Sequence, residues 1–130
     1  MKHKTFVLFV VITAFAWGLL ACGGSAEGED NTAVQAGKAL FEHSVLEGNP
    51  GCITCHSLEA SVVIVGPSMA GIATTAESKG DVDEFLKSSI IDPDADVTEG
   101  FVAGVMPKNW GELLTDEQID QLLAYLKSLK

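Results

Sequence analysis

Arginine is absent from this chain of 130 residues, and 8 lysines stand against 18 acidic residues. The formal net charge is therefore −10 at neutral pH. Nucleic acids and anionic lipid headgroups are bound through basic surfaces, which this composition does not supply. We therefore expect no nucleic-acid partner. The acidity suits docking onto a basic patch of another protein, or it mainly confers solubility.

Cysteine is scarce too, with three residues in the chain, and two of them are three positions apart in Cys52-Ile53-Thr54-Cys55-His56. Two thiols followed at once by an imidazole are typical of covalent haem attachment of the c type. On the first turn of a short helix, Cys52 and Cys55 share one face and can each form a thioether, and His56 becomes the proximal iron ligand. The alternatives are a structural zinc site, which needs a second Cys/His pair, and a thioredoxin-like dithiol, which accompanies a βαβ pattern. The sequence has neither a second Cys/His pair nor a βαβ pattern, so it predicts one covalently bound haem c.

Long apolar runs are limited to the amino terminus, where two lysines precede the run from Phe6 to Leu20. A membrane-spanning helix needs about 20 apolar residues, so residues 1–21 are better interpreted as an export signal. The run ends in Leu19-Leu20-Ala21-Cys22, which resembles the lipobox of bacterial lipoproteins. That resemblance implies cleavage before Cys22 and lipid on its thiol and new amino terminus. The alternatives are a retained membrane anchor and ordinary signal cleavage nearby.

These assignments divide the chain into three parts. Residues 1–21 are a lipoprotein signal peptide, residues 22–31 a lipidated, flexible, acidic tether, and residues 32–130 one domain. With lipid on Cys22 and haem on the other two cysteines, no thiol is left for a disulfide. Several acyl chains together make a stable anchor, which places the domain at the extracytoplasmic face of a bacterial membrane.

Apolar periodicity predicts at least three helices in the domain. The first is capped by Asn31 or Thr32 and ends near His43, and it contains Gly37. A glycine inside a helix costs about 1 kcal/mol relative to alanine, so we expect another helix to cross closely over it. The other two are Val82–Ile91, capped by Asp81, and a last helix that begins after Thr115 with a capping box through Gln118.

Two segments without helical periodicity are predicted to enclose the haem. The β-branched run Val62–Val65 ends in Gly66-Pro67 and is interpreted as an extended lining of an apolar cofactor pocket. Pro67 keeps its carbonyl, which suits a hydrogen bond from the other ring nitrogen of His56. Residues 92–114 form a long irregular segment, which we expect to wrap the far side of the haem and present Met106.

Three side chains are candidates for the sixth position of the iron. His43 lies at the polar end of a helix, where a solvated histidine is the usual case, and Met69 follows His56 too closely to reach across the ring. Met106 is far enough along the chain and is held extended by Pro107, so it is the predicted ligand. A six-coordinate iron has no open position for a substrate, which favours an electron carrier. Trp110 is expected either beside the haem or in the core.

Taken together, residues 33–130 resemble a class I monohaem cytochrome c. The matching segments occur in the order of that family: Gly37–Phe41, Cys52–His56, Gly66-Pro67, Ser89–Pro93, Gly104–Pro107 and Leu123–Leu126. The resemblance implies an all-α cytochrome c fold with three or more helices around one haem. It also implies thioethers at Cys52 and Cys55, axial ligation by His56 and Met106, a bond from Pro67 to His56, and a helix crossing through Gly37, Phe41 and Tyr125.

The function that the resemblance implies is electron transfer in a respiratory or photosynthetic chain, with no small-molecule substrate and no enzyme activity of its own. The expected partners are redox proteins or subunits of a quinol-oxidising or terminal oxidase complex. The lipid anchor adds a similarity to the monohaem cytochrome c subunit of alternative complex III, by analogy alone. The alternatives are a haem-based sensor or gas-binding domain with a displaceable sixth ligand, and a structural subunit of a membrane complex.

Overall fold

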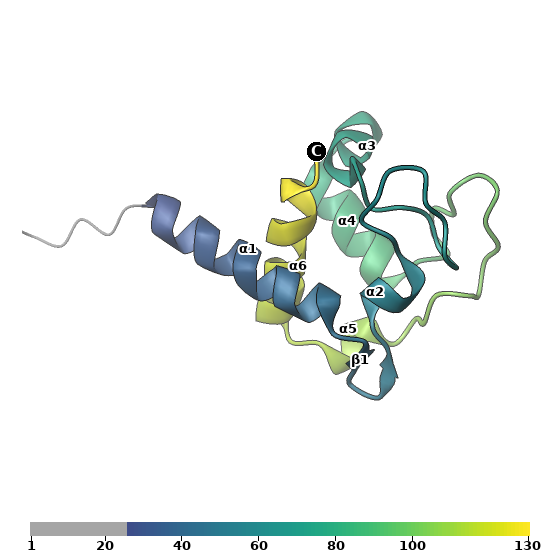
Figure 1. Cartoon of the computed structure of the whole chain (residues 1–130), viewed down its shortest axis with the longest axis horizontal. Coiled ribbons are helices and arrows are strands. Elements are labelled where there is room, and N and C mark those ends of the chain that lie inside the picture. Colours follow the sequence, from purple (N-terminus) through teal and green to yellow (C-terminus); the bar gives the residue numbers. More distant parts are fainter. Residues whose placement is uncertain (1–25) are drawn as a thin grey trace, which may run out of the picture.

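The computed structural model describes residues 26–130, which fold into helices with one very small hairpin (Figure 1). The helices are α1 (Ala26–Glu42), α2 (Cys52–Cys55), α3 (Ile72–Lys79), α4 (Val82–Ile91), α5 (Trp110–Leu113) and α6 (Asp116–Ser128). The strands are β1 (Val45–Leu46) and β2 (Asn49–Pro50). The predicted all-α fold with at least three helices is confirmed. The predicted signal peptide, Cys22 and the first part of the tether lie outside the described residues.

The first helix begins earlier than the sequence predicted. Asn31 and Thr32 were expected to cap it, but α1 starts at Ala26, so residues 26–31 are helical rather than part of a flexible tether. The sequence carries three acidic residues between positions 27 and 30. Alanine and glutamate, which make up half of residues 26–31, are strong helix formers, so a stretch without large apolar residues can extend the helix.

Helices α1 and α6 cross at Gly37, as predicted (Figure 1). A Cβ atom built on Gly37 would lie 1.8 Å from the backbone oxygen of Gln121 and 2.9 Å from Cβ of Tyr125, so only glycine allows this approach. One turn further on, the rings of Phe41 and Tyr125 pack with centroids 5.6 Å apart and planes tilted by 58°. Such tilted aromatic pairs are favourable beyond the apolar area that they bury.

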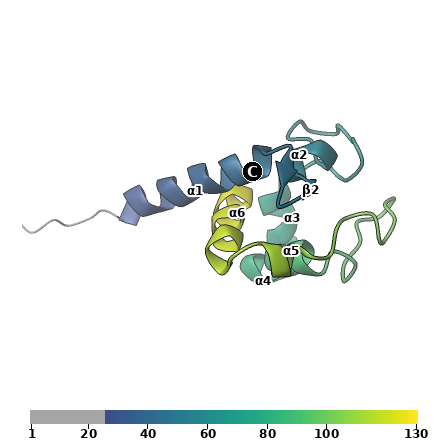
Figure 2. The same cartoon turned by 90° about the horizontal axis from the view of Figure 1, so that it is seen from below.

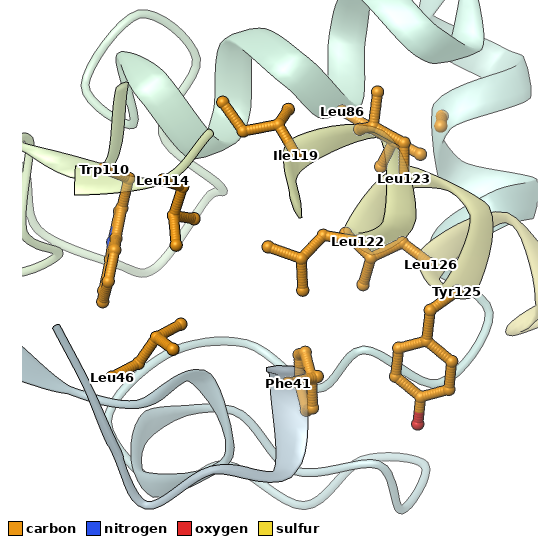
Figure 3. Packing of buried hydrophobic residues seen from close by; sticks show 11 residues of the cluster. Phe41, Leu46, Leu86, Trp110, Leu114, Ile119, Leu122, Leu123, Tyr125 and Leu126 are labelled. Carbon is orange, nitrogen blue, oxygen red and sulfur yellow. The ribbon is translucent and has the colours of Figure 1, made fainter. Parts of the chain in front are cut away.

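The buried face of α6 forms much of the hydrophobic core (Figure 3). The predicted capping box starts this helix, because Thr115 accepts from the backbone N–H of Gln118 while the Gln118 side chain accepts from the N–H of Thr115. Its buried residues are Ile119, Leu122, Leu123, Tyr125 and Leu126. They pack with residues of the other elements, namely Phe41, Leu46, Leu86, Trp110 and Leu114.

The sequence analysis did not predict α3, α5 or the hairpin. Helix α3 buries only Ala73 and Ala76, and such small residues give a weak periodic signal. The hairpin turn has positive φ at both central residues, Glu47 (48°) and Gly48 (84°), as a type I′ turn requires. Strands of two residues are too short to show an alternation of apolar and polar residues in the sequence.

Two long loops complete the domain. Residues 56–71, here the His56 loop, connect α2 to α3, and residues 92–109, here the Met106 loop, connect α4 to α5. Figure 2 shows the two loops on opposite sides of the same end of the molecule. Within residues 26–130, no helix has both the length and the apolar character that crossing a membrane requires.

Candidate functional site

A cavity of about 530 Å³ lies between the two loops, with its inner wall formed by core residues of α4, α5 and α6. Its lining is mainly apolar and includes Phe41, Leu86, Trp110 and Leu122. Protein interiors are close-packed, with few voids larger than a water molecule. A cavity of this size therefore indicates a site built to hold a large, mostly apolar group. Trp110 is buried in the core, one of its two predicted settings, and it also lines the cavity.

Helix α2 presents both thiols of the attachment motif to this cavity. Cys52 and Cys55 stand at the two ends of a single helical turn, and both line the cavity together with His56. The helix stops at His56, whose backbone is extended and whose N–H donates to the carbonyl of Cys52 at 2.9 Å. Burial raises the pKa of the Cys52 thiol, with the nearby Cys55 a smaller cause, so the neutral thiol is favoured there.

The ring of His56 is held by the far end of its own loop. Nδ1 of His56 lies 2.9 Å from the carbonyl oxygen of Pro67, which confirms the predicted hydrogen bond. Since this carbonyl only accepts, Nδ1 is the donor and Nε2 is left free to bind a metal. The carbonyl of Cys55 also accepts from the N–H groups of Val65 (3.1 Å) and Gly66 (2.9 Å), which closes the loop beside the ring.

Gly66 is a site residue whose role the sequence analysis missed. A Cβ atom on Gly66 would lie 2.5 Å from Cε1 and 2.9 Å from Nδ1 of His56. The glycine therefore leaves the space that the imidazole occupies. In the sequence, Gly66 stands out only by its place before Pro67, and the prediction at this pair concerned the carbonyl of Pro67.

The three candidate sixth ligands lie in different places relative to the cavity. Met106 lines the cavity from the Met106 loop, across from the His56 loop (Figure 2). Met69 also lines the cavity, but its backbone N–H donates to the carbonyl of Ser57 at 2.8 Å, which keeps it with the His56 loop. The side chains of Met69 and Met106 both pack against the core. His43 is exposed and is not among the residues that line the cavity, in agreement with its prediction as a solvated histidine.

Asp94 is the second residue that the sequence analysis missed. Its Oδ1 accepts from the backbone N–H of Gly104 at 2.8 Å, and its Oδ2 forms an ion pair with Nζ of Lys108. The hydrogen bond from Lys108, followed by that from Gly104, holds the pKa of the Asp94 carboxyl below its usual range. The same bond raises the pKa of Lys108. A charged residue in an aperiodic loop carries no sequence signal that would reveal these partners.

Comparison with known proteins identifies the family of the chain. The family model of cytochrome c matches residues 34–130. The chain belongs to the cytochrome c family. It is an electron-transfer protein that binds covalently attached haem c, and members of its family are electron carriers rather than enzymes. A search of curated proteins gave no significant match.

The residues of this cytochrome c fit that group. The cavity is large and apolar, two unpaired thiols and an imidazole with a free Nε2 line one wall, and a thioether lines the wall across from it. A soft thioether and an imidazole are both established haem-iron ligands. Among the described residues, no group of three or more His, Cys, Asp or Glu side chains forms an alternative metal site. The zinc-site alternative therefore finds no support in this part of the chain.

Proposed function

We propose that this cytochrome c carries single electrons with its iron held between His56 and Met106, and with Cys52 and Cys55 forming the thioethers. The observation that carries the proposal is that all four side chains line one cavity, with the two ligands on opposing loops. Bound haem supplies a one-electron iron couple. The protein residues supply a fixed imidazole, a soft thioether that favours the reduced iron, and an apolar wall that excludes water.

Two measurements test this assignment. After denaturation in acid and extraction with organic solvent, the pigment should stay with the polypeptide, because thioethers survive this treatment. The oxidised protein should also show the weak far-red absorption band of methionine-ligated ferric haem. Extractable pigment contradicts the thioethers. A missing band contradicts Met106 and favours a sensor or gas-binding domain.

Exposed apolar side chains surround the mouth of the cavity and form the proposed docking surface for the redox partner. From the His56 loop come Val62, Val63, Ile64 and Val65, and from the Met106 loop Val102 and Val105. Ile64, which does not line the cavity, is 51% exposed, and a group of exposed large apolar side chains of this kind is typical of a protein interaction site. Val63, Val65, Val102 and Val105 line the cavity, and Val62 and Ile64 are next to them in the His56 loop. A protein that docks on these side chains therefore approaches the haem edge.

The charge of the domain indicates what kind of partner fits. Residues 26–130 contain all 18 acidic residues but only 6 of the 8 lysines, a formal charge of −12 (6 − 18). Five of these lysines form ion pairs with carboxylates: Lys38, Lys79, Lys108, Lys127 and Lys130. The partner should therefore offer an apolar centre within a basic surface, and association should slow as salt rises.

A matched pair of variants tests the docking surface. Ile64→Ser should lower the rate at which quinol-energised membranes from the source cell reduce the purified protein. Val45→Ser should not, because Val45 is 66% exposed but lies in the hairpin, outside the two loops that border the cavity. Equal rates for the two variants, or a rate independent of salt, would contradict this docking surface.

We also propose that lipid on Cys22 anchors the protein at the extracytoplasmic face of a bacterial membrane, beside a quinol-oxidising or terminal oxidase complex. The lipobox-like sequence before Cys22 supports the lipid anchor, and the acidic composition of the domain supports docking onto a protein complex. Cys22→Ala should release the protein from the membrane fraction in cells, whereas its haem content should be unchanged. Affinity purification from detergent-solubilised membranes should recover subunits of such a complex. Recovery of the protein alone contradicts the assignment to a complex.

A further inference from the structure

The segment that presents Met106 has few attachments of its own. Among the described residues, two backbone hydrogen bonds join residues of the Met106 loop, and each closes a local turn: Ala95 N–H to the carbonyl of Asp92 and Phe101 N–H to the carbonyl of Thr98. Neither turn includes a residue after 101. At the end of the loop, the side chain of Asn49 donates to that of Asn109 at 3.1 Å. Residues 104–108 therefore depend on other contacts to hold their position.

Asp94 supplies those contacts on both sides of Met106. One carboxylate oxygen accepts from the N–H of Gly104, two residues before the methionine, at 2.8 Å. The other pairs with Lys108, two residues after it. One side chain thus fixes both flanks of a short segment whose central residue faces the cavity. Hydrogen bonds to a charged group are stronger than those between neutral groups.

Asp94 is itself well placed to act as an anchor. Asp94 comes three residues after Ile91, the last residue of α4, and directly after Pro93. The helix is closed by a bond from the N–H of Asp92 to the carbonyl of Ser88 at 2.8 Å. The Asp94 side chain is only 23% exposed, compared with 48% for Asp96 in the same loop. Gly104 has φ of 80°, a conformation that glycine adopts at little cost, and in it the N–H meets the carboxylate.

We propose that Asp94 is a positioning residue that keeps Met106 at the iron by tying residues 104–108 to the end of α4. The inference rests on the proposed ligation by Met106. Asp94 does not touch the iron in this arrangement. It lowers the population of open loop conformations in which an external ligand replaces the methionine.

Titration of the oxidised protein with imidazole measures that open population. In Asp94→Ala the apparent imidazole dissociation constant should fall about tenfold, because a charged hydrogen bond and an ion pair that favour the closed loop are lost. Lys108→Gln keeps the bond to Gly104 and should give a smaller fall. Asp94→Asn retains an oxygen acceptor for Gly104 and should behave like Lys108→Gln.

Asp96→Ala is the matched control. Like Asp94, Asp96 is a carboxylate of the same loop that lines the cavity. The substitution breaks its 2.7 Å pair with Lys79, and among the described residues Asp96 makes no hydrogen bond or ion pair to residues 104–108. Its imidazole affinity should equal that of the wild type. Amide hydrogen exchange gives a second measurement: the Gly104 N–H should exchange faster in Asp94→Ala and at the wild-type rate in Asp96→Ala.

The outcomes separate the two proposals. Equal imidazole affinity and equal Gly104 exchange in Asp94→Ala and Asp96→Ala would overturn the role of Asp94 while leaving Met106 as the ligand. A wild-type protein without the far-red methionine band would overturn Met106 ligation, and this inference with it. Haem content measured on each variant verifies that attachment, which depends on residues 52–56, is intact.

Discussion

Gly66 lies against the face of the His56 imidazole so closely that a single added methyl group would overlap the ring, with Cε1 only 2.5 Å from the new carbon. The same ring is fixed by the 2.9 Å bond from Nδ1 to the Pro67 carbonyl. Two consecutive residues thus set both the position and the hydrogen bonding of the predicted proximal ligand.

Gly66→Ala should therefore displace the imidazole and weaken its bond to Pro67. Overpacking of this kind costs about 1–3 kcal/mol in stability, and the haem absorption spectrum should change as well. Gly111→Ala is the control, since its Cβ would meet Ile91 at an ordinary 3.4 Å. Thermal unfolding and absorption spectra of the two variants check this, and a wild-type spectrum for Gly66→Ala would contradict it.

Gly37→Ala should force α1 and α6 apart. The new Cβ would stand 1.8 Å from the backbone oxygen of Gln121, and a backbone atom cannot move aside as a flexible side chain can. We expect a loss of about 3 kcal/mol or more in the free energy of unfolding, the upper end of overpacking costs. Denaturant unfolding measures it. A cost similar to that of Gly111→Ala would mean that the helices separate easily.

Met106→Leu and Met69→Leu compare two methionines that line the same cavity. The first should abolish the far-red band and lower the reduction potential, because the thioether that favours reduced iron is lost. The second should retain the band and cost less than about 1.5 kcal/mol in stability, as a volume-conserving exchange. Visible spectroscopy and potentiometry check both. Loss of the band in Met69→Leu alone would exchange the roles of the two residues.

The ion pair between Asp94 and Lys108 predicts a specific pH dependence. Because the folded-state pKa of Asp94 is depressed, chiefly by Lys108, its stabilising contribution is complete above the ordinary value of 3.8 and is lost as pH falls below it. The pKa of Lys108 is raised, so the contribution is also lost as pH rises above 10.5. Between these two pH values the stabilising contribution of the ion pair should be constant. Unfolding free energies of the wild type and Asp94→Ala should converge in acid, and a difference independent of pH would contradict this.

The sequence by itself determined the chemistry of the site and the strongest helices. Cys52 and Cys55 are three residues apart, so their shared face follows from one helical turn, and His56 follows that turn directly. The capping residues Asp81 and Thr115 act within three residues of themselves, and their helices were predicted correctly for that reason. The bond to Pro67 could be predicted because its loop returns after 11 residues to the ring that it supports.

Only the tertiary structure decided what depends on contacts between distant segments or on weak local patterns. Helix α3 buries two alanines, which leave almost no periodic signal, and α1 extends into a stretch whose composition suggested a tether. Gly66 and Asp94 are identified as site residues by what they touch, an imidazole ring and the two flanks of Met106. Such contacts depend on how the chain returns on itself in space, which residue types and their spacing do not specify.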